Sequence, residues 1–132
     1  MALELDGGAV VYQMRAKEPY YLLLKSATSG FWGFPKGHLE NTESALEAAE
    51  REISATVDDR FYDVLNYRVG ENDKKVTLFT AKVPEDTVVR LQKEEISMAA
   101  WLDYAAARKR LTYLNLKQAL DNADQYIRKA EQ

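Results

Sequence analysis

The sequence contains no cysteine, only three prolines and a single histidine among its 132 residues. The absence of cysteine excludes a disulfide framework, a thiol nucleophile and a cysteine-based zinc site. No apolar run reaches the length of a membrane-spanning helix, and the N-terminus lacks a basic segment followed by an apolar one. We therefore expect a cytoplasmic protein that does not contact a membrane.

The sequence also has no excess of positive charge, because it contains 18 lysines and arginines and 21 acidic residues, for a net charge of −3. This balance argues against broad electrostatic binding to nucleic acid, although local lysines can still bind a small polyphosphate. The hydrophobic content of 46% and the charged content of 30% are typical of a soluble globular protein. With no internal repeat, the length predicts one domain over residues 1–132.

The most informative stretch joins a rigid loop to a helix. The loop contains Gly33, Pro35 and Gly37, where glycine allows close backbone approach and proline stiffens the turn. Ser44 fits the N-cap of the helix, and Glu47 completes a capping box. A stiff loop that leads into a helix holds carbonyl and amide groups in fixed positions, as binding sites require. An ordinary tight loop is the alternative interpretation.

With its spacing, this stretch resembles the Nudix box, in which conserved glycine, glutamate, Arg-Glu and aliphatic positions follow at fixed intervals. The positions in register here are Gly37, Glu43, Arg51, Glu52 and Ile53. The preceding segment, Trp-Gly-Phe-Pro-Lys-Gly-His, resembles the subgroup that cleaves dinucleoside polyphosphates such as diadenosine tetraphosphate (Ap4A). The resemblance implies a fold of mixed α and β class, with a curved mixed sheet sandwiched between helices, and hydrolysis of a nucleoside polyphosphate at a phosphoanhydride bond.

The second half of the box departs from the family pattern. Ala55 and Thr56 stand where the family has a Glu-Glu pair, and residues 58–59 are both Asp where it has Gly and an aliphatic residue. With Glu52, the missing pair would lie on one helical face, where clustered carboxylates hold Mg²⁺ or Mn²⁺. We therefore expect weakened metal binding and impaired or altered hydrolysis. The alternative is a non-catalytic Nudix domain that binds a nucleotide or a protein partner.

The resemblance implies roles for the matching residues. Glu52 would be the principal metal ligand, helped by the backbone carbonyl of Gly37, and Arg51 would orient Glu52 or Glu43. Glu95 precedes a tryptophan at the position where Nudix enzymes often carry a catalytic base or a further metal ligand. A surface acid is the alternative interpretation of Glu95.

Phosphate contacts are expected from four basic side chains, namely Lys36, His38, Lys74 and Lys75. A solvated loop is the alternative for the histidine, and discouragement of edge-strand pairing is the alternative for the lysine pair at 74–75. The subgroup often has a tyrosine on the strand that follows the turn predicted at residues 70–73. Leu78 stands there instead, which argues against base stacking at that position.

Hydrophobic periodicity and turn residues predict the remaining elements. We expect strands over residues 7–12, 20–25, 61–69 and 76–83, a last strand that opens at Trp101, turns at 15–19 and 70–73, and a break at 58–60. Asp103 is expected to cap a short helix that ends at residue 110. A final helix is expected to start at Thr112 or Asn115, with an apolar stripe of Leu116, Leu120, Ala123 and Ile127 that packs in the core.

Overall fold

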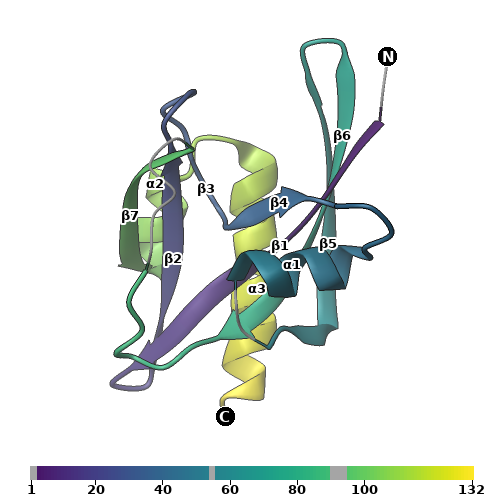
Figure 1. Cartoon of the computed structure of the whole chain (residues 1–132). Coiled ribbons are helices and arrows are strands. Elements are labelled where there is room, and N and C mark those ends of the chain that lie inside the picture. The colour runs from purple at the N-terminus through teal and green to yellow at the C-terminus, as the bar shows by residue number, and fades with distance from the viewer. Residues whose placement is uncertain (1–2, 54–55, 90–94) are drawn as a thin grey trace.

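The computed structural model describes residues 3–53, 56–89 and 95–132. These residues form seven strands and three helices (Figure 1). In chain order they are β1 (Leu3–Arg15), β2 (Glu18–Ser26), β3 (Trp32–Gly33), β4 (Lys36–His38), α1 (Ala45–Ile53), β5 (Asp58–Val69), β6 (Asn72–Lys82), β7 (Ile96–Asp103), α2 (Tyr104–Arg110) and α3 (Leu114–Ala130).

The strands form one mixed sheet in the order β3-β2-β1-β6-β5, with β4 paired to β1 and β7 paired to β2. The pair β1–β6 is parallel, and the pairs of β1 with β2 and β4, of β2 with β3 and β7, and of β5 with β6 are antiparallel. The long central strand β1 therefore joins the two halves of the sheet. The first half of β1 pairs with β4 and with the N-terminal half of β6, and the candidate site lies where these three strands meet.

Helices cover both faces of the sheet, so the predicted mixed sheet between helices is confirmed (Figure 1). Residues 7–12 of β1 are buried on both sides and form a continuous run without polar side chains apart from a tyrosine, as expected for a central strand. On one face their side chains pack with the α3 stripe, in which Leu120, Ala123 and Ile127 are fully buried. On the other face they pack with Ala49 of α1. Among the described residues, no helix is long and apolar enough to cross a membrane.

Two of the three predicted helix starts are confirmed. The Ser44 Oγ accepts a hydrogen bond from the Glu47 backbone N–H at 3.1 Å, and the Ser44 N–H donates to Glu47 Oε1 at 3.0 Å, which is the capping box. Asp103 caps α2 by accepting from the Ala106 N–H at 2.9 Å. The predicted start of the last helix is wrong, because α3 begins after Tyr113, whose side chain makes no cap hydrogen bond.

Strand ends were the least predictable feature. The first hairpin closes through Ala16 and Lys17 alone, both with positive φ, rather than through a loop of several residues. The expected break at 58–60 is part of β5, because Asp58 pairs with Thr80 before a register shift in the strand. Trp101 lies inside β7 rather than at its start. In each case backbone pairing with a neighbouring strand of the sheet extends an element beyond the residues that the local pattern predicts.

Candidate functional site

A cavity of about 820 Å³ lies beside the Gly33–Gly37 loop, and its lining comes from segments far apart in the sequence. Four charged side chains expected at the site line it, namely Lys36, Glu52, Lys74 and Glu95. A second hollow of about 430 Å³, between β5 and α3, contains none of these residues. The cavity lining thus contains half of the residues to which the sequence assigned catalytic, metal-binding or phosphate-binding roles.

Glu52 lies directly against Gly37, because a Cβ added to Gly37 would collide with the Glu52 carboxylate. Gly7 similarly allows the backbone of Ala45, the first residue of α1, to approach β1. Glycine is thus required at 37 by the side chain it faces and at 7 by the helix it carries. These two close approaches fix the α1 carboxylate at the edge of the cavity.

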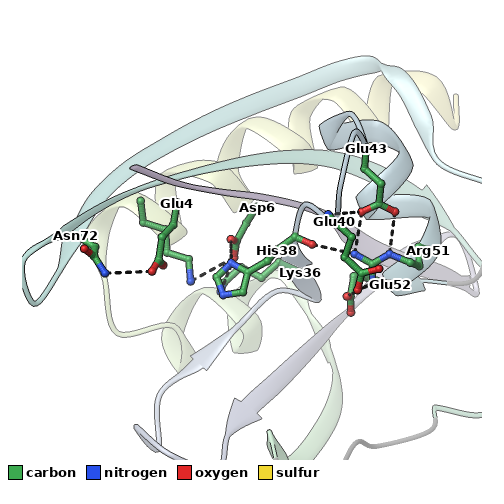
Figure 2. Close-up of polar contacts among 10 residues, drawn as sticks. Glu4, Asp6, Lys36, His38, Glu40, Glu43, Arg51, Glu52 and Asn72 are labelled. Atoms are coloured by element: carbon green, nitrogen blue, oxygen red, sulfur yellow. Dashed lines mark hydrogen bonds and ion pairs between the residues drawn. The ribbon is translucent and has the colours of Figure 1, made fainter. Parts of the chain in front are cut away.

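Arg51 connects the two glutamates of the box. Its guanidinium donates to both Glu43 oxygens at 2.9 and 3.1 Å, to Glu52 Oε1 at 2.7 Å and to the backbone carbonyl of His38 at 2.9 Å (Figure 2). The hydrogen bonds from Arg51 lower the pKa of Glu43. The arginine therefore contacts both of the acids that it was expected to orient, and ties them to β4.

Three of the expected phosphate ligands converge on an acid that the sequence analysis missed. Lys36 and Lys74 each place Nζ 3.3 Å from Asp6 Oδ2. His38 Nδ1 lies 2.7 Å from Asp6 Oδ1 (Figure 2). The Asp6 side chain is only 2% exposed. The pairing of β1 with both β4 and β6 brings these residues onto one face of the sheet.

The remaining expected residues divide clearly. Lys75 is exposed and is not part of the cavity lining, because successive strand residues point to opposite faces. Glu95 lines the cavity just before β7, and its backbone carbonyl accepts a hydrogen bond from the Ala27 N–H at 2.8 Å. That bond holds the start of β7 next to the end of β2.

Aromatic side chains form one wall of the cavity. Phe31 and Tyr113 meet edge to face with ring centroids 5.1 Å apart, and the Arg110 guanidinium lies 4.8 Å from the ring centroid of Trp32. Tyr67 also lines the cavity, and burial raises its pKa. Leu78, by contrast, is buried in the hydrophobic core, so a nucleotide base cannot stack on its side chain.

The acidic residues of the site are spread over separate segments. Among the described residues, no group of three histidine or acidic side chains is close enough to hold one. Helix α1 is described over Ala45–Ile53, and Thr56 is not helical, so position 56 does not continue the helical face of Glu52 as predicted. Ala55 lies outside the described residues. Glu52 and Glu95 on one cavity fit an ion that arrives with a nucleotide, since Mg²⁺ is commonly held by one or two carboxylates plus substrate phosphates.

Comparison with known proteins identifies the family. The NUDIX domain pattern matches residues 5–124. The bis(5'-nucleosyl)-tetraphosphatase (asymmetrical) of Sus scrofa is 32% identical over 117 residues, which cover 80% of this chain and 79% of that protein. The structure is similar to a C. elegans Ap4A hydrolase in a binary complex, with a TM-score of 0.87, 24% identity and coverage of 94% of this chain and 97% of the other.

The NUDIX domain of Shewanella oneidensis NrtR, solved with ADP ribose, shares the fold with a TM-score of 0.78 at 18% identity, over 96% of this chain and 90% of the other. The family pattern spans nearly all of the described sheet and helices. The chain therefore belongs to the Nudix family, as the Gly37–Ile53 stretch predicted.

Proposed function

We propose that this protein binds a nucleoside polyphosphate of the Ap4A type in the cavity and hydrolyses it slowly at a phosphoanhydride bond. The main support is that two lysines, two glutamates and an aromatic wall share one cavity. The similarity to the Sus scrofa tetraphosphatase and to the C. elegans Ap4A hydrolase supports the proposed substrate class.

The lining suggests how the ligand would lie. A base would stack on the aromatic wall at Trp32 and Tyr113, because flat apolar rings bind the faces of aromatic ligands. The phosphates would extend toward Lys36 and Lys74, whose ammonium groups supply positive charge on the same cavity. This orientation directs the phosphoanhydride bonds toward the glutamates.

In the proposed reaction, a water oxygen forms a bond to phosphorus while the anhydride P–O bond breaks and the nucleotide leaves with the electron pair. Glu95 would accept the proton of the attacking water. Lys36 and Lys74 would hold the phosphates in line, and Arg51 would keep Glu52 directed at the cavity.

Nudix hydrolases generally use divalent metal ions, and Glu52 with Glu95 and the Gly37 carbonyl would hold Mg²⁺ or Mn²⁺ in the presence of the nucleotide. Such an ion neutralises negative charge on the phosphates. Because the family's Glu-Glu pair is replaced by Ala55 and Thr56, we expect weaker metal binding and a lower rate than in relatives that keep the pair.

A non-catalytic nucleotide-binding domain is the second candidate. It is favoured by the same replacement and by the lack of a three-carboxylate cluster among the described residues. It predicts the same ligand in the same cavity, without turnover.

The test is incubation of Ap4A with wild type, Glu52→Gln and Glu50→Gln in Mg²⁺ or Mn²⁺, with separation of the products. Glu50 is the matched control because it lies on α1 but does not line the cavity. We expect ATP and AMP from wild type and Glu50→Gln, and none from Glu52→Gln. Calorimetric binding without turnover would select the non-catalytic domain, and absence of both would refute the proposal.

A further inference from the structure

Asp6 is a buried carboxylate beneath the two lysines of the cavity. Exposure of the side chains rises outward, from 2% for Asp6 to 13% for Lys74 and 35% for Lys36. Both lysines line the cavity and Asp6 does not. The acid thus contacts both ammonium groups without being part of the cavity lining.

Both Asp6 oxygens already have partners. One oxygen is shared by the Lys36 and Lys74 ammonium groups, each at 3.3 Å, and the other lies 2.7 Å from His38 Nδ1. Since the two ammonium groups lie near one oxygen, they are no further apart than twice that distance. Without the carboxylate, two like charges would be held close together in a half-buried place, which is unfavourable.

A phosphate group that binds to these lysines would offer them negatively charged oxygens, which Asp6 already supplies. It would also meet the negative charge of Asp6 directly behind them, and that repulsion is screened little because Asp6 is buried. A polyphosphate therefore binds to a group of two positive charges and one negative charge, rather than to two positive charges alone.

We propose that Asp6 is a built-in counterion for Lys36 and Lys74 that stabilises the empty protein and lowers the affinity of the cavity for polyphosphates. Asp6 thereby determines how strongly the cavity selects ligands by charge. The proposal rests on the proposed function, because it assumes that phosphates bind at these lysines. A purely structural Asp6 would have a different signature, in which its loss weakens both folding and binding.

The test is calorimetric titration of AMP, ADP and ATP into wild type and Asp6→Asn, in the presence of a chelator so that nothing is hydrolysed. We expect Asp6→Asn to bind ATP about tenfold more tightly, with a smaller gain for AMP, because the removed repulsion scales with ligand charge. Unfolding in urea without ligand should occur at a lower midpoint in Asp6→Asn. Asp6→Ser serves the same purpose if the asparagine variant does not fold.

Two controls separate the local effect from net charge. Asp86→Asn makes the same change in net charge on the exposed turn after β6, outside the cavity, and should leave all three affinities unchanged. In a Lys74→Met background, Asp6→Asn should increase the affinity for ATP by a smaller factor. One of the two ammonium groups for which Asp6 and the phosphate compete is then missing.

The outcomes distinguish the two proposals. If wild type binds ATP and neither Asp6 variant binds it more tightly, or if the gain is equal for AMP and ATP, the counterion role is wrong while the proposed function stands. If no form of the protein binds any of the nucleotides, the counterion role fails. The proposed function fails as well if Ap4A with Mg²⁺ is not bound either.

Discussion

The Glu52 carboxylate of α1 packs onto the α-carbon of Gly37 in β4, so closely that the two residues leave no space for a methyl group between them. Gly37 of β4 and Glu52 of α1 are thus in a contact that a residue with a Cβ atom at position 37 would prevent. This contact explains why the Gly37 and Glu52 positions of the Nudix box belong together in this chain.

Gly37→Ala should therefore displace the Glu52 carboxylate from the cavity edge. Because the colliding atoms belong to the end of a flexible side chain, Glu52 can turn away, so we expect loss of Ap4A hydrolysis with a change of no more than about 1 kcal/mol in the free energy of unfolding. Gly33→Ala is the matched control, because a Cβ there meets nothing within 4 Å. A wild-type rate of Ap4A hydrolysis in Gly37→Ala would show that the close contact does not position Glu52.

Arg51→Lys should lower the rate of hydrolysis about tenfold or more, because lysine cannot reproduce the paired hydrogen bonds to Glu43 together with those to Glu52 and the His38 carbonyl. Arg60→Lys is the control, since Arg60 makes a similar double contact with Asp58 outside the cavity. Steady-state kinetics would contradict this role of Arg51 if both variants kept the wild-type rate.

The neighbouring lysines 74 and 75 provide an internal comparison. Lys74→Met should raise the dissociation constant for Ap4A about tenfold, the effect of losing one charge-assisted hydrogen bond to phosphate. Lys75→Met should leave it unchanged, because that side chain lies outside the cavity lining. Calorimetry that found equal losses for both variants would indicate general attraction by the charge of the strand instead of a specific contact.

Stability at low pH should depend on Asp58. Hydrogen bonds from Arg60 and Tyr126 lower the pKa of its carboxyl below the usual value, so its ionised form stabilises the fold. That contribution, about 1 kcal/mol, is present above the unfolded-state pKa near 4 and is lost as the pH falls toward the lowered folded-state pKa. Urea unfolding should find Asp58→Asn less stable than wild type at pH 7, with a difference that narrows below pH 4. A constant difference would contradict the assignment.

Local chemistry explains which parts of the fold were predictable. The capping box at Ser44 and the cap at Asp103 depend on residues close in sequence, and both were correct. Asp6 was missed because its neighbours come from β4 and β6, which pair with β1 across long sequence separations. The only sequence signal was a charged residue just before the apolar run of β1, and that position reads equally well as a flexible start.

The break predicted at Asp58 failed for a related reason. An acid after a helix suggests a solvated loop, but Tyr126 of α3 donates to this carboxylate at 2.6 Å and Arg60 pairs with it. A partner far along the chain thus compensates for a residue that is locally unfavourable in a strand. Lys74 and Lys75 differ for a local reason, because successive residues of a strand point to opposite faces and only Lys74 lines the cavity.

The most direct test of the account is a titration of Ap4A with Mg²⁺ into ¹⁵N-labelled protein, followed by the backbone amide signals. If the cavity binds the nucleotide, the largest shifts should cluster at Gly33, Lys36, Lys74 and Tyr113, whether or not hydrolysis follows. Shifts centred on Tyr62 and Asn122 in the hollow between β5 and α3, or no shifts at all, would contradict it.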